Sequence, residues 1–471
     1  MSASGHVVVV GGGLAGLSAA IACLDGGARV TLLEGRPRLG GATWSFERRG
    51  LEFDNGQHVH LRCCTEYRSF LERLGTSHLA PLQARLALPV LRPAPGEGGP
   101  PALGWIRRSR LPLPAPLHLA GSLLSYRHLA LSDRLRLLRA AARLRLARLD
   151  DERLDSVSFG DFLARHGQRP EAVRAMWELI TLPTTNLRSA DVSLGLAAKV
   201  FQTGLLTRAD AADIGWSKAP LARLHAEPAA RLIGRLGGEI LTRAKAVRIE
   251  TAPFEEGVEV TGVLLEDGSR IGADAVVLAV PHGAAADLLP PGAHPESGSL
   301  RALGSSPVVN VQVVYDRKVT AFSVAAGLDS PVQFVFDRSA AAGLDPAAAG
   351  QVLAVSLSGG DAEIGERAEV LVERITGELP RLFPSARRAE VLDAVVTREH
   401  EATFRGLPGT RALRFGPATG IANLKVAGAW TDTGWPATME GAVRSGRAAA
   451  RALGALGHLL PKPAARKEVV V

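Results

Sequence analysis

The chain opens with a pattern of apolar positions that predicts a strand, a helix and a second strand. Residues 7–10 form a β-branched run, residues 14–24 have helical periodicity and end at Gly26 and Gly27, and residues 28–33 form another apolar run. Two strands joined in this way by a helix make a βαβ unit. The first domain is therefore expected to begin as an open α/β sheet.

The middle of the chain is predicted to consist of loops and helices. Residues 82–116 are rich in proline and glycine, which indicates loops or an inserted excursion without a regular core element. Ser132 and Asp133 are suited to cap a helix over residues 132–149, and further helices extend to about residue 224. That helix has an apolar stripe, and arginines occupy the remainder. The stripe consists of Leu135, Leu138, Ala142, Leu146 and Leu149, and the arginines are Arg134, Arg136, Arg139, Arg143, Arg145 and Arg148.

Strands dominate the pattern in the second half of the chain. Short apolar runs separated by turns predict two groups of strands, followed by a helix and by a final strand, loop and helix. The first group is 246–250, 258–266 and 275–280, and the second group is 308–315, 332–336 and 352–358. The helix is expected at 361–382, the last strand at 426–429, and the loop and helix at 430–456.

Composition and charge narrow the class of protein only a little. The 471 residues are 46% hydrophobic and 22% charged, which is typical of a globular protein of two or three domains. A net charge of +8 favours anionic surfaces. No platform of aromatic and basic residues accompanies it, so we expect no nucleic-acid partner.

Neither a disulfide framework nor a metal site is expected. Cys23, Cys63 and Cys64 show no CxxC or other metal-ligand spacing, so a reducing compartment is the default. The first residues, MSASGH, lack the cationic region of a secretory signal, and no uninterrupted apolar stretch approaches the length of about 18 residues that a spanning helix needs. The expected localisation is cytoplasmic, with peripheral contact at the inner face of a membrane as an alternative.

Glycines between the first strand and the first helix predict a dinucleotide site. Gly11, Gly13 and Gly16 form G-x-G-x-x-G, which allows a tight turn, close approach of the main chain to a pyrophosphate, and packing of helix on strand. The N–H groups at the helix start then face the phosphates. Glu34 ends the second strand, where its carboxylate can accept hydrogen bonds from ribose hydroxyls. The predicted phosphate contacts are Gly11, Gly13, Leu14, Ala15 and Gly16.

A second glycine cluster favours FAD over NAD. Arg38 and the pair Gly40-Gly41 come just after the ribose-binding acid. Arg38 can neutralise diphosphate charge, and the glycines let the main chain pass close to the cofactor. On these residues the sequence resembles the flavin amine oxidase and phytoene desaturase superfamily. The resemblance extends the predicted cofactor contacts to Ala42 and Thr43.

Further segments resemble the same superfamily. Residues 273–281 resemble the strand by which its members re-enter the FAD domain. Val247 lies on a segment that resembles the strand whose main chain contacts the adenine. Residues 426–446 resemble the flavin-closing motif, in which the N-terminus of a helix faces the flavin N1 and O2. The contacts that this motif implies are Gly428, Thr438 and Met439.

The flavin-closing segment departs from the superfamily at one position. Members usually carry Gly-Asp where this chain has Gly428-Ala429, so the acid that holds the ribityl chain is absent there. Asp432 is a candidate replacement. This departure puts one cofactor contact in doubt and leaves the others in place.

Together these resemblances imply an α/β fold in which a discontinuous, Rossmann-like FAD-binding domain carries an α+β substrate-binding domain. The FAD domain is expected from residues 1–85, 225–285 and 420–456. The substrate domain is expected from residues 86–224 and 286–419, and residues 457–471 are expected to form a flexible tail.

Two segments resemble one family within the superfamily more closely. Residues 53–64, with FDNGQHV and LRCC, and residues 430–446, WTDTGWPATMEGAVRSG, are similar to the hydroxysqualene dehydroxylases of bacterial squalene and hopanoid biosynthesis. The resemblance implies that an allylic C30 alcohol loses its hydroxyl and receives a hydride from reduced flavin to give squalene. Such a reaction needs a donated proton, exclusion of water and an apolar tunnel for a long-chain isoprenoid substrate.

Candidates for the proton and orientation chemistry follow the glycine pair. Asp54, Gln57 and His58 lie on the stretch that is expected to approach the isoalloxazine, and His58 is the first choice as acid. The alternative is structural, because Asp54-Asn55-Gly56 is also good turn chemistry and the histidine can simply bind a main-chain carbonyl. Trp430 and Trp435 either flank the flavin or substrate or belong to the core.

Three other functions are alternatives to this reaction. A carotenoid desaturase or isomerase would use the same scaffold, and a non-catalytic isoprenoid-binding protein would lack the FAD chemistry that the glycines and the tail imply. An amine oxidase would need an aromatic cage that is not recognisable. One dinucleotide fingerprint is present, so an NAD(P)H reductant would need another site or a separate electron donor. The oligomeric state and covalent attachment of flavin are left open.

The arginine-rich helix has two interpretations. With residues 111–131, which are rich in leucine, proline and histidine, it can form a membrane-contacting entrance for a water-insoluble substrate. A surface helix with a solvated basic face explains the same residues. Peripheral membrane contact therefore stays a hypothesis of the sequence.

Overall fold

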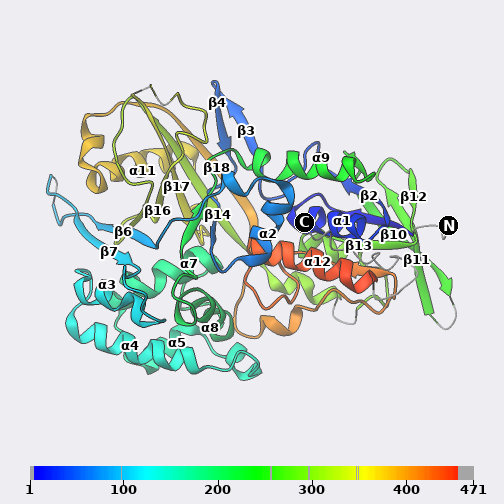
Figure 1. The fold of residues 1–471 in the computed structure, drawn as a ribbon, viewed down its shortest axis with the longest axis horizontal. Coiled ribbons are helices and arrows are strands. Elements are labelled where there is room, and N and C mark those ends of the chain that lie inside the picture. Colours follow the sequence, from blue (N-terminus) through cyan, green and yellow to red (C-terminus); the bar gives the residue numbers. More distant parts are fainter. Residues whose placement is uncertain are drawn as a thin grey trace, which may run out of the picture.

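The structure is a computed structural model that describes residues 5–96, 98–254, 257–294, 297–345, 347 and 349–454. The tail expected at 457–471 lies outside these residues. Two large sheets and a helical lobe form most of the described fold (Figure 1). The five-stranded sheet lies at one end of the molecule, and the seven-stranded sheet and the helical lobe lie at the other.

The five-stranded sheet is parallel and has the order β19-β13-β1-β2-β9. Its strands are β1 (His6–Val10), β2 (Arg29–Glu34), β9 (Glu239–Thr242), β13 (Ala275–Leu278) and β19 (Leu424–Val426). One face is covered by α1 (Leu14–Asp25), α2 (Thr65–Leu74), α9 (Glu227–Arg235) and α12 (Met439–Gly454). The other face packs on an antiparallel sheet of β10 (Ala246–Phe254), β11 (Gly257–Leu265) and β12 (Arg270–Gly272). This layered arrangement is the doubly covered parallel sheet that apolar strands require.

The seven-stranded sheet has the order β18-β14-β17-β16-β15-β6-β7. It is antiparallel except for the pairing of β15 with β6. Its strands are β6 (Ala87–Arg92), β7 (Ala102–Arg107), β14 (Ser305–Tyr315), β15 (Val324–Gly327), β16 (Phe334–Asp337), β17 (Gln351–Ser358) and β18 (Val391–Phe404). The helix α11 (Ala368–Leu382) packs on one face of the sheet.

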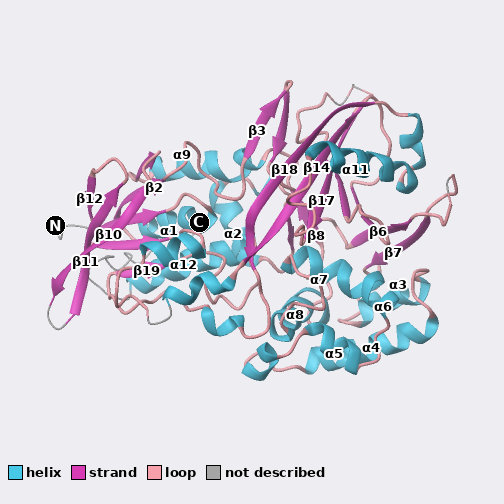
Figure 2. Cartoon of the chain, turned by 180° about the vertical axis from the view of Figure 1, so that it is seen from behind, coloured by secondary structure: helices cyan, strands magenta, loops and turns pink. Residues whose placement is uncertain are grey.

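The helical lobe fills the space beside this sheet (Figure 2). Its helices are α3 (Ala120–Ser125), α4 (Leu131–Leu146), α5 (Phe159–Arg165), α6 (Pro170–Ala172), α7 (Glu178–Thr185) and α8 (Leu194–Phe201). They share one apolar core with β6, β15 and β16. Short connections complete the described fold: β3 (Ser45–Arg48), β4 (Leu51–Asp54), β5 (Val59–Leu61), β8 (Ile214–Trp216) and α10 (His282–Leu288).

The predicted α/β class and the opening βαβ unit are confirmed, and some boundaries differ. The last strand, predicted at 426–429, covers Leu424–Val426, because the chain turns at Gly428, whose φ is +147°. The strand predicted at 275–280 ends at Leu278. The helix predicted at 361–382 begins only at Ala368, since the residues before it form turns.

The prediction of loops without a core element over residues 82–116 is wrong. This segment contains β6 and β7, which form a hairpin at the end of the seven-stranded sheet. Nearly all of the prolines lie outside the two strands, either between them or after β7, so they mark the connections and not the strands. Pro89 lies within β6, but β15 pairs only with Val90 and Leu91, so Pro89 interrupts no pairing there.

The helix predicted at 132–149 exists, but its cap and its buried stripe are wrong. It runs from Leu131 to Leu146 with Ala130 at the N-cap, and no side chain caps it. Asp133 instead accepts hydrogen bonds from Arg169 (2.8 Å) and Arg136 (3.2 Å). The predicted apolar stripe faces outward, because a different row of apolar residues packs on the lobe. Leucines on both sides made the sequence pattern ambiguous.

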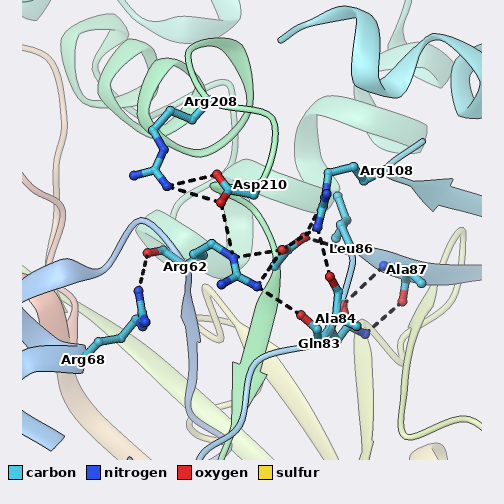
Figure 3. Close-up of polar contacts among 10 residues, drawn as sticks. Arg62, Arg68, Gln83, Ala84, Leu86, Ala87, Arg108, Arg208 and Asp210 are labelled. Carbon is cyan, nitrogen blue, oxygen red and sulfur yellow. Dashed lines mark hydrogen bonds and ion pairs between the residues drawn. The ribbon is translucent and has the colours of Figure 1, made fainter. Parts of the chain in front are cut away.

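A buried carboxylate joins the lobe to the rest of the chain. Asp213 has no exposed surface and accepts hydrogen bonds from Arg62 (3.0 Å), Arg108 (2.8 Å) and the Leu86 N–H (2.7 Å). Figure 3 shows the Arg62 and Arg108 side chains converging, with Asp210 beside Arg62. Arg62 follows β5 and Arg108 follows β7, so the Asp213 carboxylate connects two segments that are far apart in the sequence.

Candidate functional site

The glycine-rich loop between β1 and α1 has the geometry of an anion site. Gly11 has a φ of +110°, and a Cβ there would lie 2.4 Å from the Ala279 carbonyl oxygen. A Cβ on Gly16 would lie 1.8 Å from the Gly11 carbonyl oxygen. Gly13 stands at the N-cap of α1 without a side-chain cap, and the first turn, beginning at Leu14, contains no acid. The helix therefore presents free N–H groups without competing negative charge, which fits a pyrophosphate.

Glu34 ends β2 directly beside this loop. One of its carboxylate oxygens accepts the Gly12 N–H at 2.8 Å, and the other accepts the Arg36 N–H at 2.8 Å. These contacts fix the carboxylate at the edge of the sheet where the phosphate loop turns. The position suits a carboxylate that binds ribose hydroxyls, so Glu34 fits the predicted role.

The glycine pair packs against the phosphate loop. Gly40 has a φ of +104° and its N–H donates to the Gly12 carbonyl at 2.9 Å. Gly41 has a φ of +58°, and a Cβ there would lie 2.9 Å from the Gly13 Cα. Both positions favour glycine, because a Cβ at Gly40 would meet the Thr43 carbonyl of its own loop and a Cβ at Gly41 would meet the phosphate loop. The two glycine clusters, separate in the sequence, thus form one cradle of main chain.

Residues next to the glycine pair hold this loop in place. Arg38 stacks on the Trp44 ring, 3.9 Å from its centroid, and donates to the Gly41 carbonyl at 3.4 Å. The Thr43 hydroxyl donates to the Gly40 carbonyl at 2.8 Å. The Ala42 carbonyl accepts a hydrogen bond from the Asn55 side chain at 2.8 Å. The predicted diphosphate role of Arg38 stays a prediction.

Val247 lies on β10, where the pairing with β11 is irregular. Ala246 pairs with Leu265 and Arg248 pairs with Leu264, so the register shifts at Val247. Its side chain is 42% exposed. A bulge of this kind leaves main-chain groups outside the ladder, as a contact with the adenine would require. The adenine contact itself stays a prediction.

The flavin-closing segment forms a loop and a helix, as its resemblance implies. α12 begins at Met439, and the Thr438 hydroxyl accepts the Gly441 N–H at 3.2 Å. The Gly428 N–H donates to the Ser445 hydroxyl at 2.8 Å. Asp432 is exposed and accepts the Gly434 N–H at 3.1 Å, so its carboxylate serves a local turn.

α12 crosses α1 at a point that requires glycine. A Cβ on Gly446 would lie 2.1 Å from the Ala15 carbonyl oxygen and 2.9 Å from the Ala19 N. The close crossing places the N-terminus of α12 near the phosphate loop of β1 and α1. Three segments, carrying the two glycine clusters and the tail, therefore meet at the carboxyl edge of the parallel sheet, where α/β folds bind ligands.

His58 lies on the stretch after the glycine pair and is half-buried. Its Nδ1 lies 2.9 Å from the Gly56 carbonyl oxygen, so Nδ1 carries a hydrogen and donates. Burial lowers the pKa of the imidazole, so the ring is neutral at neutral pH and its Nε2 is free of a hydrogen. The Gln57 side chain turns back and donates to the His58 carbonyl at 3.1 Å. Of the predicted catalytic residues, His58 retains a ring nitrogen for a proton.

Asp54 has a structural environment. Its carboxylate pairs with the buried Arg338 at 2.5 Å and accepts the Ser45 hydroxyl at 2.6 Å and the Leu221 N–H at 2.8 Å. These contacts hold β4 against the segment around residue 221. A catalytic role for Asp54 stays a prediction.

Two side chains beside the cradle had no signal in the sequence. Glu399, on β18, accepts hydrogen bonds from the Trp44 indole (3.2 Å) and the Asn55 amide (2.9 Å) and so ties the seven-stranded sheet to the glycine loop. Arg414 is buried and donates to the carbonyls of Trp430 (2.9 Å) and Trp435 (2.9 Å). Burial lowers its pKa to about 10. Both contacts join residues far apart in the chain, which local patterns do not reveal.

The two tryptophans of the tail have different surroundings. Trp430 is a core residue, since it is 4% exposed and its indole donates to the Val280 carbonyl at 2.9 Å. Trp435 is also a core residue, 9% exposed, and two cations lie near its ring: Lys199 is 5.4 Å and Arg444 is 5.1 Å from the ring centroid. Burial lowers the pKa of Lys199. Within the described ranges, no group of three or more His, Cys, Asp or Glu side chains is arranged to hold a metal ion.

Comparison with known proteins decides the family. The model of flavin containing amine oxidoreductases matches residues 14–454, which include α1, the Gly40-Gly41 loop and α12. The chain belongs to this family. It is an enzyme, a flavin-dependent oxidoreductase, and its cofactor is FAD. The phosphate loop, the glycine cradle and the start of α12 fit that cofactor on the geometry given above.

Relatives of this chain include two different activities. A hydroxysqualene dehydroxylase from Sinorhizobium fredii is 29% identical over 94% of this chain and 97% of its own length. A zeta-carotene desaturase from Synechocystis sp. is 26% identical over 95% of this chain and 97% of its own length. The resemblance to hydroxysqualene dehydroxylases is thereby confirmed, and a similar likeness to desaturases stands beside it.

Solved structures confirm the fold. A cyclohexylamine oxidase from Brevibacterium oxydans has a TM-score of 0.68 with 20% identity, covering 96% of this chain and 99% of its own. The putative protoporphyrinogen oxidase from Exiguobacterium sp. has a TM-score of 0.66 with 18% identity, covering 97% and 100%. At these identities the likeness concerns the architecture alone.

Proposed function

We propose that this enzyme is a hydroxysqualene dehydroxylase. An allylic C30 alcohol and reduced FAD give squalene, water and oxidised FAD: the C–O bond breaks, the hydroxyl leaves with a proton as water, and a hydride forms the new C–H bond. FAD, in its reduced form, supplies the hydride. The protein must hold the alcohol close, deliver a proton to its oxygen and keep water away from the allylic cation.

One observation carries the proposal. The segment 53–64, which resembles the dehydroxylases, is attached directly to the loop that carries Gly40 and Gly41. Asn55 donates to the Ala42 carbonyl at 2.8 Å and accepts the Trp44 N–H at 3.1 Å. The part of the chain most characteristic of that family is therefore hydrogen-bonded to the loop that is predicted to contact the flavin. The Sinorhizobium fredii relative supports the same activity.

His58 is our candidate for moving the proton. Its Nδ1–H is committed to the Gly56 carbonyl, which fixes the ring and leaves Nε2 as the atom that takes up and delivers a proton. Burial lowers its pKa, which makes the imidazolium a stronger acid whenever it forms. Delivery of the Nε2 proton to the leaving hydroxyl would release water and regenerate the neutral ring.

The surroundings of the aromatic residues argue against an amine substrate. Arg38 covers Trp44, and Lys199 and Arg444 lie beside Trp435. An ammonium group is attracted by a free aromatic face and is repelled by cations already placed there. A neutral isoprenoid alcohol encounters neither effect.

A carotenoid desaturase is the second candidate, supported by the Synechocystis sp. relative. It would use the same cofactor site in the oxidative direction, removing hydrogen from a polyene. With one phosphate loop of this type among the described residues, we infer that a dehydroxylase receives its electrons from a separate donor.

The deciding experiment mixes the dithionite-reduced protein with hydroxysqualene without oxygen. Stopped-flow absorbance would follow the flavin, and extraction would identify the product. We expect recovery of oxidised-flavin absorbance with an equal amount of squalene. A flavin that stays reduced while the alcohol is unchanged would reject the dehydroxylase, and reduction of the oxidised enzyme by zeta-carotene would establish the desaturase.

The His58→Gln variant tests the proton step. We expect single-turnover flavin reoxidation to fall about 10²- to 10⁴-fold. In the unaltered enzyme the rate should rise only as pH falls below the ordinary histidine pKa of 6.5, because burial lowers the pKa of the ring; the variant should lose that rise. His400→Gln, the same change at an exposed histidine of β18, is the control. An unchanged pH profile in His58→Gln would remove His58 from the mechanism.

A further inference from the structure

Exposed leucines are concentrated in one short part of the chain. Leu111, Leu117 and Leu124 precede α4 with 56–68% of each side chain exposed, and Leu131, Leu135, Leu138 and Leu146 lie on α4 with 49–75% exposed. We call these seven residues the leucine face. Elsewhere in the described chain, only Leu236 and Leu392 are exposed leucines. Such a concentration marks a surface that something covers.

The exposed leucines of α4 are not its core stripe. At 3.6 residues per turn, Leu131, Leu135, Leu138 and Leu146 fall within about 80° of the circumference. The residues that pack on the lobe lie on the opposite side: Asp133, Leu137, Ala140 and Leu144 are at most 8% exposed. A helix that faced only water would carry polar side chains on its outer side. α4 is apolar on two sides, and the fold covers one of them.

Contacts gather the leucines of the preceding segment beside α4. Arg134 donates to the Leu124 carbonyl and, at 2.7 Å, to the Tyr126 carbonyl, so the end of α3 lies at the first turn of α4. Arg145 donates to the Ala115 carbonyl at 3.3 Å, which places the loop with Leu111 and Leu117 along the last turns. Figure 1 and Figure 2 both show α3 and α4 at the end of the molecule away from β10–β12. The leucine face is therefore one surface at one end.

The charge around this surface is almost entirely positive. Residues 107–149 contain ten arginines and one acid, Asp133, which Arg169 and Arg136 already bind. Four exposed arginines here have no hydrogen-bond or ion-pair partner among the described residues: Arg110, Arg127, Arg139 and Arg143. They are free to bind anions from outside the protein.

A basic hollow lies beside α3. It has a volume of about 480 Å³, and Arg107, Arg127 and His118 are among its lining residues. His118 is 1% exposed, and neither of its ring nitrogens has a hydrogen-bond partner in the described structure. A buried imidazole without a partner at the wall of a basic hollow suits an acceptor that is supplied from outside, such as a phosphate oxygen.

We propose that the leucine face docks on an anionic phospholipid bilayer. The leucines enter the acyl-chain boundary, and the surrounding arginines bind lipid phosphates, the combination found in helices that lie in a membrane interface. A second copy of the chain suits the face less well, because it would place ten arginines against ten others. No helix in the described part of the chain is long and apolar enough to span a bilayer. The inference stands independently of the reaction proposed above.

The test is co-sedimentation of the full-length protein with vesicles of phosphatidylcholine alone or mixed with phosphatidylglycerol. We expect binding to the mixed vesicles and little to phosphatidylcholine alone. Leu135→Ser/Leu138→Ser should need at least about tenfold more lipid for half-binding. Arg139→Gln/Arg143→Gln should weaken binding about tenfold at low salt, and less at high salt. The matched control, Leu236→Ser/Leu392→Ser, changes exposed leucines elsewhere and should bind like the unaltered protein.

Three results would overturn the proposal. One is an unaltered protein that stays in the supernatant with the mixed vesicles, and another is equal binding by Leu135→Ser/Leu138→Ser. The third is a dimer in sedimentation velocity that this variant converts to a monomer, which would assign the face to a second copy. Thermal melts confirm that the variants are folded, and hydrogen exchange gives a readout that needs no variant. We expect slower exchange over residues 111–146 when mixed vesicles are added.

Discussion

The helices α1 and α4 are both rich in leucine and alanine, but their surroundings differ. α1 is enclosed by the parallel sheet, α9 and α12, and its twelve residues carry a single charge at Asp25. α4 carries five arginines in sixteen residues and is enclosed on one side only. A helix with almost no charged residues can be buried on all sides at little cost. Arginine side chains keep their guanidinium groups in water or bound to phosphates. Charge content decided how completely each helix could be buried.

The largest expected effect is at Asp213, which connects the helical lobe to the rest of the chain. Asp213→Asn removes the buried anion while Arg62 and Arg108 remain charged, and should lower the free energy of unfolding by about 4 kcal/mol. Urea denaturation followed by fluorescence would measure it. Asp210→Asn is the control: its side chain is 40% exposed, so the loss should be below about 1 kcal/mol. Equal losses would mean that Asp213 does not join the regions.

The two apolar sides of α4 should differ in their contribution to stability. Leu144→Ala removes a side chain with no exposed surface and should cost about 3 kcal/mol. Leu135→Ala changes a side chain that is 65% exposed and should alter the free energy of unfolding by less than about 0.5 kcal/mol. Thermal and urea unfolding of the pair give the comparison directly. A large loss in Leu135→Ala would show that the fold itself covers the leucine face.

The enclosure of α1 depends on glycine at its crossing with α12. Gly446→Ala should cost about 2 kcal/mol, since the new methyl group meets the Ala15 carbonyl and the helices must separate. The purified variant should also contain less FAD, measured as the ratio of flavin absorbance to protein absorbance. Gly377→Ala makes the same change on α11, where no atom lies within 4 Å of the new group. It should stabilise the protein by about 0.5 to 1 kcal/mol, and a loss there would refute the steric explanation.

The last expected effect concerns the response of the buried His225 to acid. Burial lowers the pKa of His225 from 6.5 to about 3, and its Nε2 lies 2.7 Å from the Tyr67 hydroxyl. The unfolded chain takes up this proton below pH 6.5 while the folded chain does not, so stability falls as pH drops. The slope should be about 1.4 kcal/mol per pH unit for this residue. His225→Gln should reduce the measured slope between pH 6 and 4 by that amount, and an unchanged slope would assign it to other groups.

The cofactor half could be predicted well because its signals are local. Gly11, Gly16 and Gly40 occupy positions where the main chain turns with positive φ or touches another main chain, and no other residue fits. Such constraints act within a few residues and can therefore be recognised in the amino-acid sequence. The part with the seven-stranded sheet has no comparable constraints: its prolines obscured the hairpin of β6 and β7, because a strand position depends on which neighbour pairs with it.

The candidate site divides in the same way. Asp54 looked like a possible acid in the sequence, but it pairs with Arg338, 284 positions away. Glu399 reaches the glycine loop from β18, and Arg414 holds the tail, without any pattern that indicates either role. Contacts over such separations depend on how the sheets pack, and a single sequence does not specify that packing.

By itself the sequence determined the α/β class and the FAD cofactor, and it singled out residues 53–64, which lie beside the loop of Gly40 and Gly41. Glycine positions and strand periodicity reveal these features because they act through local sterics. Only the tertiary structure decided which carboxylates are paired, how the imidazole of His58 is oriented and which side of α4 is buried. The physical reason is that burial and hydrogen bonding depend on partners brought together from distant parts of the chain. Leucines on both sides of one helix are equivalent until a core covers one row and leaves the other exposed.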